Sequence, residues 1–266
     1  MSMEGRRHSV TSPDGTPIGL LTAGQGPPLL LVHGGMGRLE RWAPMWEHLT
    51  GHWQVTAMDR RGRGSSGDHQ PYAAAREHED IAAVAEHLAR DAGGSVAAFG
   101  HSIGATFTLG AAAAGAPLRR IVLYEPPGPA AAPAPWRERV AALIAAGKPG
   151  PAMVSFMTEI LGMSRDQIAE LRQNVPGGYD VLPIVSATMV RESEVVAATD
   201  LPALARGVTI PVLLFVGELS PPWARDETAR LAAALAHATV TTLPATAHDA
   251  LDTHQDLLTR LLREFL

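Results

Sequence analysis

The sequence of 266 residues contains no cysteine. It can therefore form no disulfide framework, no thiol nucleophile and no cysteine-based metal site. No run of apolar residues is long enough to span a bilayer, so we expect no membrane partner. The opening MSMEGRRHSV has basic residues without an apolar stretch behind them, which is not the pattern of a signal peptide. A cytoplasmic protein is the expectation.

Charge is also sparse. Charged residues make up 18% of the chain, the net charge is -5, and there is no block of five like charges. A nucleic-acid partner would require a basic surface, so none is expected. Hydrophobic residues make up 46%, which is enough for a sizeable core in one large domain. We expect a monomer or a homodimer.

Short apolar runs alternate with amphipathic or alanine-rich segments along most of the chain. The runs predict strands at 28–32, 53–58, 95–99, 120–124, 211–216 and 239–243. The other segments predict helices at 76–90, 103–114, 223–236 and 254–266. A Pro-Asp-Gly turn within 9–21 predicts an antiparallel hairpin at one edge. The pattern predicts an α/β fold with a mainly parallel, doubly wound, eight-stranded sheet.

The pattern changes between residues 126 and 207. A stretch rich in proline and alanine, EPPGPAAAPAPW, leads away from the sheet. Helical segments follow at 137–146, 152–161, 165–174 and 181–199. We therefore expect an all-helical cap of residues 127–206, inserted after the sixth strand and placed over the carboxyl edge of the sheet. The core domain would comprise residues 1–126 and 207–266.

A serine lies between two glycines in GHSIG, at residues 100–104. A strand that enters G-x-S-x-G and leaves as a helix turns sharply and exposes the serine hydroxyl above the sheet. The helix start also directs free N–H groups and positive potential to this point. A serine that only caps the helix is the alternative. The strand–turn–helix context favours Ser102 as a nucleophile.

Four motifs together resemble the α/β-hydrolase fold superfamily. They are HGG at 33–35, DRRGRGSSG at 59–67, GHSIG at 100–104, and a late histidine before the final helix. The resemblance covers essentially the whole chain, and the helical insertion lies where that family carries its cap. It implies the fold described above and hydrolysis by a serine nucleophile, but it does not specify the substrate.

A serine hydroxyl is a weak nucleophile and requires an adjacent base. His248 lies in PATAHDALD, between the last strand and the last helix, and the order Ser…acid…His matches the hydrolase pattern. A surface loop histidine is the alternative. His101 and His33 are interpreted as structural, the latter as a brace for the HGG loop. Asp249 is interpreted as a helix cap.

The triad acid departs from the family pattern. Many members place it three residues after the glycine that ends the strand PVLLFVG, but here that glycine is Gly217 and position 220 is a serine. One candidate is Glu125, where relatives with lactonase or dehalogenase chemistry place their acid. The other is Glu218, two residues short of the usual position. Asp226 is expected on a helix surface. An incomplete triad is the remaining possibility.

Acyl transfer also requires hydrogen-bond donors for the oxyanion. The backbone N–H of Ile103 is one expected donor, and the resemblance implies the N–H of Gly35 as the second. HGGMG is glycine-rich, but no GK[ST] follows, so a nucleotide site is not favoured. The arginines of DRRGRGSSG are interpreted as structural ion pairs. The expected pocket residues are Met36, Trp136, Met153, Phe156, Met157 and Met189.

These residues suggest a mainly apolar acyl or ring substrate. The leading hypothesis is a serine hydrolase that cleaves a carboxylic ester or lactone with Ser102, His248 and Glu125, and needs no metal or organic cofactor. A serine nucleophile argues against epoxide hydrolases and haloalkane dehalogenases, which use aspartate. The alternatives are a carbon–carbon bond hydrolase or cofactor-free lyase with the same triad, and a small-molecule receptor without turnover.

Overall fold

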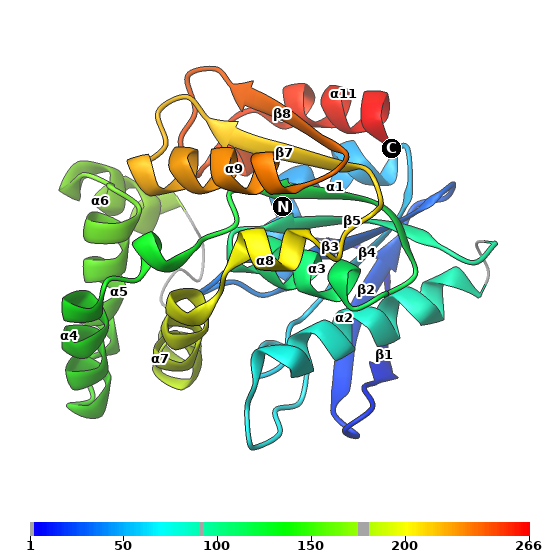
Figure 1. The fold of residues 1–266 in the computed structure, drawn as a ribbon. Helices are drawn as coiled ribbons and strands as arrows, with labels where there is room; N and C mark the ends of the chain where they lie inside the picture. Colours follow the sequence, from blue (N-terminus) through cyan, green and yellow to red (C-terminus); the bar gives the residue numbers. More distant parts are fainter. Residues whose placement is uncertain (1–2, 91–92, 175–180) are drawn as a thin grey trace.

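The computed structural model describes residues 3–90, 93–174 and 181–266. Within them, eight strands form one sheet in the order β1-β2-β4-β3-β5-β6-β7-β8 (Figure 1). The strands are β1 (Arg6–Thr11), β2 (Pro17–Ala23), β3 (Pro28–Val32), β4 (Gln54–Met58), β5 (Val96–His101), β6 (Leu118–Tyr124), β7 (Val212–Gly217) and β8 (Ala238–Leu243). β1 and β2 form an antiparallel hairpin at one edge, and β3 to β8 are parallel to one another. The predicted sheet and its edge hairpin are confirmed.

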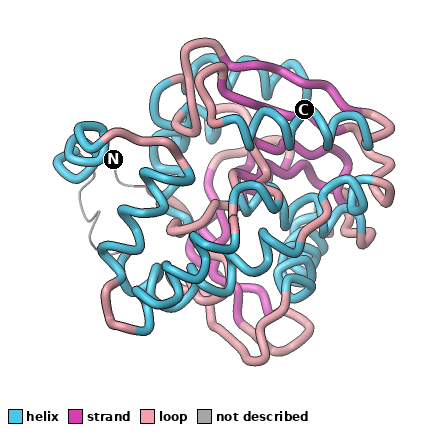
Figure 2. The backbone as a smooth tube through the Cα atoms, turned by 60° about the vertical axis from the view of Figure 1, so that its left-hand side comes forward, coloured by secondary structure: helices cyan, strands magenta, loops and turns pink. Residues whose placement is uncertain are grey.

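Helices cover both faces of this sheet (Figure 2). On β3, Leu29 and Leu31 belong to the apolar cluster formed with α1 (Ala43–Thr50) and α11 (Gln255–Phe265). Leu30 and Val32 belong to the cluster formed with α2 (Ala74–Ala89), α3 (Ile103–Ala113) and α9 (Pro222–Ala234). Because side chains alternate along a strand, a sheet covered on both faces has continuously apolar strands. The doubly wound architecture is confirmed. The sequence pattern did not predict α1 or the short helices η1 (Leu39–Trp42) and α10 (Ala250–Thr253).

The described residues between β6 and β7 form only helices and connecting turns. These are η2 (Pro129–Ala131), α4 (Ala134–Ala145), α5 (Pro149–Ser155), η3 (Phe156–Ile160), α6 (Arg165–Asn174), α7 (Leu182–Ala198) and α8 (Leu201–Ala205). The predicted helical segment at 152–161 is helical, but it is not one regular helix, because α5 ends at Ser155 and a π-helical turn, η3, follows. The predicted cap range also includes residues 175–180, which lie outside the described residues. The division at 127 and 206 stays a prediction.

The candidate catalytic residues lie just after the carboxyl ends of parallel strands. Gly35 follows β3, Ser102 follows β5, Glu125 follows β6 and His248 follows β8. In an open parallel sheet, loops at this edge converge on a crevice that binds ligands. Residues far apart in the chain therefore meet at one site.

Candidate active site

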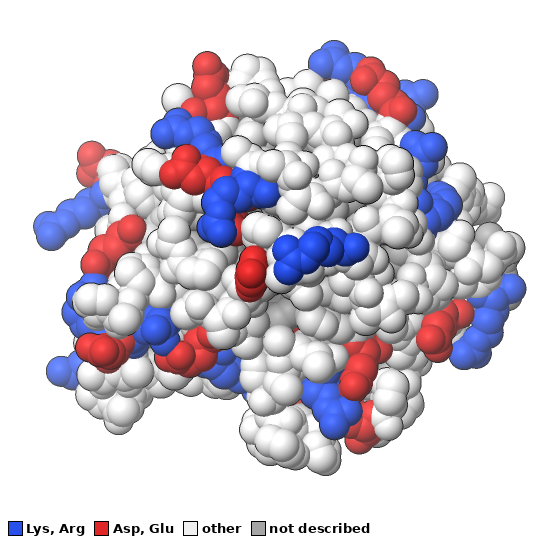
Figure 3. All heavy atoms as spheres, viewed as in Figure 1, with Lys and Arg blue, Asp and Glu red and all other residues white. Residues whose placement is uncertain are grey.

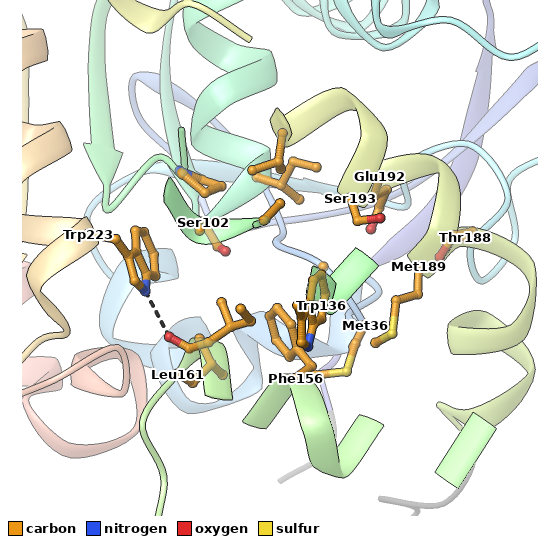
Figure 4. Close-up of a pocket in the computed structure, with 17 residues that line it drawn as sticks. Met36, Ser102, Trp136, Phe156, Leu161, Thr188, Met189, Glu192, Ser193 and Trp223 are labelled. Atoms are coloured by element: carbon orange, nitrogen blue, oxygen red, sulfur yellow. Dashed lines mark hydrogen bonds between the residues drawn. The ribbon is translucent and has the colours of Figure 1, made fainter. Parts of the chain in front are cut away.

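Ser102 occupies a strained turn between β5 and α3. Its backbone has φ 56 and ψ -133, a left-handed conformation that is uncommon for a residue with a side chain. The Ser102 N–H donates to the Tyr124 carbonyl over 2.8 Å. A Cβ at Gly104 would collide with the carbonyl oxygens of Val32 and His33, so only glycine fits there. The turn directs the Ser102 hydroxyl into a pocket (Figure 4).

Glu125 and His248 are in direct contact. Glu125 is fully buried just after β6, and its Oε2 lies 2.5 Å from His248 Nδ1. Its Oε1 accepts hydrogen bonds from the Gly217 N–H, over 2.8 Å, and from the Ser220 hydroxyl. Three contacts therefore fix the orientation of this carboxylate. Ser220, at the position where many α/β-hydrolases carry the acid, serves as a donor to it.

The other acidic candidates lie elsewhere. Glu218 is exposed and accepts a hydrogen bond from the Ala245 N–H over 2.9 Å. Asp226 is exposed on α9, as expected. Asp249 occupies the N-cap position of α10, as predicted, but its side chain makes no capping hydrogen bond. Its carboxylate turns back and accepts from the Ala247 N–H over 3.0 Å, which leaves the α10 start without a side-chain cap.

Aromatic rings surround His248. The ring centroid of His101 lies 4.6 Å from that of His248, and those of Tyr124 and Trp223 lie 5.8 Å and 6.1 Å away. The His248 side chain is 12% exposed, whereas the Glu125 side chain that it contacts is fully buried. The Tyr124 hydroxyl donates to the Ala247 carbonyl, which holds the loop that carries His248.

His101 is buried, and neither of its ring nitrogens has a hydrogen-bond partner among the described residues. Burial and then the proximity of His248 hold the pKa of His101 well below its ordinary value. The ring of His101 packs beside that of His248. The sequence supported a structural role for His101, because it adjoins Ser102 on a turn and neighbours on a turn point apart. It did not place His101 against His248, because the two residues are far apart in the chain.

The loop after β3 contributes the second half of the site. His33 is buried, its Nδ1 donates to the Gly34 carbonyl over 2.8 Å, and its Nε2 accepts from the Arg60 N–H over 3.1 Å. Burial and the nearby Arg60 lower the pKa of His33, which agrees with a neutral bracing role. No hydrogen bond from the N–H of Gly35 or Ile103 to another described residue is found. Both groups are free to donate to a ligand at Ser102.

The pocket at Ser102 contains about 580 Å³ of empty space, part of it open to solvent. Met36, Trp136, Phe156 and Met189 line it, together with Gly35, Ser102, Ile103, Pro127, Ala131, Ala132, Ile160, Leu161, Thr188, Glu192, Ser193, Val196 and Trp223. The placement of Met153 and Met157 in the lining is not supported. Met157 lies in the π-helical turn and packs, partly buried, against the apolar core. Met153 is buried in the apolar interior instead.

The sequence reasoning missed Glu192, a buried charge in this lining. Its Oε1 accepts hydrogen bonds from Arg60 Nη2 and Arg63 Nη2, each over 2.5 Å. Arg60 also pairs with Glu77 over 2.8 Å. Burial raises the pKa of Glu192, but Arg63 and Arg60 outweigh it and hold the pKa below its ordinary value. The arginines do form ion pairs as expected, but a partner far along the chain gives no local signal.

In the described ranges, no cluster of three or more His, Cys, Asp or Glu side chains could hold a metal ion. Nor does any helix there have the length and apolar character needed to cross a membrane. On the face seen in Figure 3, acidic and basic side chains are interspersed among uncharged ones.

A model of the alpha/beta hydrolase family matches residues 29–260. The chain belongs to the alpha/beta hydrolase family. It is similar to the crystal structure of an alpha/beta hydrolase from Sphaerobacter thermophilus, with 35% identity, a TM-score of 0.80, and coverage of 96% of this chain and 100% of that one. A hydrolase from Pseudomonas aeruginosa has 25% identity, a TM-score of 0.79, and 98% coverage of both chains.

A curated relative of this alpha/beta hydrolase is the N-formylmaleamate deformylase of Pseudomonas putida. It is 40% identical over 107 residues, and the matched part spans 39% of either protein. The resemblance to the superfamily is thereby confirmed, and the family together with its relatives supports a hydrolase.

Proposed function

We propose that the protein is a serine hydrolase that cleaves a carboxylic ester or lactone of a mainly apolar small molecule. The observation that carries the proposal is the 2.5 Å contact between Glu125 Oε2 and His248 Nδ1, at the same sheet edge as the strained Ser102. A nucleophile, a base and a group that orients the base are the parts that acyl transfer requires. The apolar lining beside Ser102 supports an apolar substrate.

The chemistry follows from these positions. Because Nδ1 of His248 faces Glu125, Nε2 is the nitrogen available to remove the Ser102 proton. Oγ of Ser102 attacks the carbonyl carbon, and the resulting oxyanion accepts hydrogen bonds from the N–H groups of Gly35 and Ile103. The imidazolium, stabilised by Glu125, then gives its proton to the departing alkoxide.

Release of the alcohol leaves an acyl-enzyme on Ser102. A water molecule loses its proton to His248 and attacks the acyl carbonyl, and the Ser102 oxygen departs with that proton. For a lactone, the alcohol stays attached to the acyl chain, so a single hydroxy acid is released. These steps use no metal or organic cofactor.

A second candidate is the hydrolysis of a formyl amide. The relative from Pseudomonas putida is named as a deformylase, and it is 40% identical to this chain over 107 residues. The same steps would apply, with nitrogen in place of oxygen in the leaving group. N-Formylmaleamate and p-nitrophenyl butyrate, assayed side by side, distinguish the two candidates.

The first test is the intact mass of the protein after incubation with a fluorophosphonate, with Ser102→Ala as the control. We expect one adduct on the wild type and none on the variant, together with turnover of the ester. An unlabelled wild-type protein contradicts the proposal. Labelling without turnover of any ester or lactone points instead to carbon–carbon bond chemistry or to a receptor.

A further inference from the structure

The lining of the pocket holds a group of polar side chains that the proposed mechanism does not use. Helix α7 contributes Thr188, Glu192 and Ser193, and the two indoles belong to Trp136 and Trp223. Figure 4 shows Glu192 and Ser193 on the same helix as Thr188 and Met189, across the pocket from Trp223. The remaining side chains of the lining, apart from Ser102, are apolar. These five groups therefore decide which polar substituents a ligand can carry.

Both hydroxyl groups that α7 contributes to the lining already donate their single hydrogen within the helix. Thr188 donates to the Ile184 carbonyl over 2.8 Å, and Ser193 donates to the Val190 carbonyl over 2.7 Å. A hydroxyl has a single hydrogen to donate and two lone pairs to accept with. Toward a ligand, these two groups therefore act as acceptors.

Both indoles are also committed as donors. Trp223 Nε1 donates to the Ile160 carbonyl over 2.8 Å, the dashed contact in Figure 4. Trp136 Nε1 donates to the Ser155 hydroxyl over 3.1 Å. An indole has one N–H and no acceptor, so neither ring has a hydrogen bond left to offer. They present apolar surface to the ligand.

Glu192 is the charged member of the lining. The two arginines bind its Oε1, and no hydrogen bond to its Oε2 is found among the described residues. A Cβ built on Gly35 would stand 3.5 Å from Oε2, so this oxygen lies against the wall next to Ser102. Arg60 and Arg63 are fully buried and do not line the pocket. Arg60 and Arg63 pair with two carboxylates, Glu77 and Glu192. Of these four charged side chains, only Glu192 lines the pocket, so a ligand meets a negative charge.

We infer that the pocket selects substrates that carry a hydrogen-bond donor, such as a hydroxyl, an amide N–H or an ammonium group, directed at Glu192, and that it rejects substrates bearing a carboxylate or phosphate. This inference rests on the proposed ester or lactone hydrolysis and names its substrate class. N-Formylmaleamate carries a carboxylate, so the inference argues against the second candidate. An anionic substituent would lose its hydration, meet a like charge and find no side-chain donor in the lining other than the Ser102 hydroxyl. Specificity would therefore come from an unfavourable charge as much as from a favourable contact.

A matched series of p-nitrophenyl esters tests the inference on the wild-type enzyme. The acyl groups are hexanoyl, 6-hydroxyhexanoyl, 6-aminohexanoyl and the monoanion of adipic acid. We expect kcat/KM for the adipate ester to be at least about a hundredfold below that for the 6-aminohexanoate ester, because like charges in a desolvated site repel strongly. Equal rates, or a preference for the adipate ester, would overturn the inference.

A binding measurement separates this inference from the proposed function. Hexan-1-amine and hexanoate are titrated into wild-type protein by calorimetry, which needs no turnover. Tighter binding of the amine upholds the selectivity, and tighter or equal binding of hexanoate overturns it. If the hexanoate ester is not hydrolysed while the amine still binds more tightly, the proposed function fails and the selectivity stands.

The variant Glu192→Gln tests the assignment to this residue. We expect the ratio between the 6-aminohexanoate and adipate esters to fall at least about tenfold, because the charge is lost and the shape is kept. The matched control is Glu194→Gln, on the same helix but exposed and paired with Arg137. An unchanged ratio in a folded Glu192→Gln protein overturns the assignment. If that variant does not fold, the wild-type ester series and the calorimetry decide.

Discussion

The hydroxyl of Ser220 donates a hydrogen bond to Oε1 of Glu125, and Oε2 of the same carboxylate contacts His248 Nδ1. Ser220 follows β7, while Glu125 follows β6. The residue at the usual position of the acid thus supports a carboxylate that comes from the neighbouring strand. This exchange is chemically sensible, because a buried carboxylate requires donors for its remaining lone pairs.

Replacing Glu125 with glutamine should nearly abolish ester hydrolysis. An amide in this place keeps the shape but favours the wrong histidine tautomer and no longer stabilises the imidazolium, which typically costs about 10⁴ in kcat. The measurement is kcat for p-nitrophenyl butyrate. Glu218→Gln serves as the control and should behave like the wild type, since Glu218 binds the Ala245 N–H in an exposed loop. The opposite result would assign the acid to Glu218.

The acid should be transferable between the two strands. In a Glu125→Ala protein, an aspartate introduced by Ser220→Asp would stand close to the vacated carboxylate position. We expect this double variant to recover at least about tenfold in kcat over Glu125→Ala alone, because a positioned charge again stabilises the imidazolium. Ser220→Asn in the same background is the uncharged comparison. Equal rates for the Asp and Asn proteins would show that the place cannot serve His248.

Gly34 should tolerate no side chain. A Cβ there would stand 2.8 Å from the Cβ of Ser102, closer than real atoms pack, so Gly34→Ala must displace the nucleophile. A shift of about 1 Å at a reacting group can cost about 10²-fold in rate. Gly37→Ala is the matched control in the same loop, because its nearest neighbours are 3.4 Å away. Rates of fluorophosphonate labelling report the effect, and comparable rates for both variants would contradict it.

The buried ion pairs around Arg60 should be essential for stability. Arg60→Met leaves Glu77 without the partner that it meets at 2.8 Å, and removing one member of a buried pair typically costs about 3–5 kcal/mol. Arg139→Met breaks an exposed pair with Glu159, which should change stability by about 0–1 kcal/mol. Urea unfolding measures both values. Similar losses for the two variants would rule out a special contribution from the buried cluster.

Stability should fall as the pH is lowered below 6.5. Burial depresses the pKa values of His33 and His101 in the folded protein, so the unfolded chain binds protons first and gains stability from them. Each histidine contributes a slope of about 1.4 kcal/mol per pH unit between its unfolded and folded pKa values. In the variant His101→Phe, the free energy of unfolding should therefore fall less steeply between pH 6.5 and pH 5 than in the wild type. Chemical unfolding at several pH values checks this, and an unaltered slope would refute it.

The regular parts of the fold were predictable because their signals are local. Buried strands are continuously apolar, as 28–32 shows, and a strand–glycine–serine–glycine–helix sequence has one common geometry. Ser102 could be singled out for that reason. The irregular π-helical turn at Phe156–Ile160 has no such signal, and the composition of the segment did not show that Met153 packs in the apolar interior and not in the pocket lining.

The partners across the fold could not be predicted in the same way. Spacing alone left both Glu125 and Glu218 open, because the direction of a carboxylate depends on the backbone turn after its strand. Glu125 has φ 49, a conformation that usually requires glycine, so the residue type at this position did not indicate it. Glu192 lies more than a hundred residues from Arg60, so their contact depends on the tertiary fold alone. The ring of His101 beside His248 was missed for the same reason.

Helix α7 is bound to the loop after β4 at more than one point. Glu192 meets Arg60 and Arg63 at 2.5 Å, and Arg191 meets Asp68 at 2.7 Å. For protein engineering, this means that α7 and residues 59–68 should be exchanged together when segments are taken from a relative. A helix grafted from a relative without a carboxylate at position 192 would leave the buried Arg63 without its carboxylate partner and would leave Arg60 with Glu77 alone. A library of variants in the part of the pocket lining that α7 contributes should therefore vary both segments together or neither.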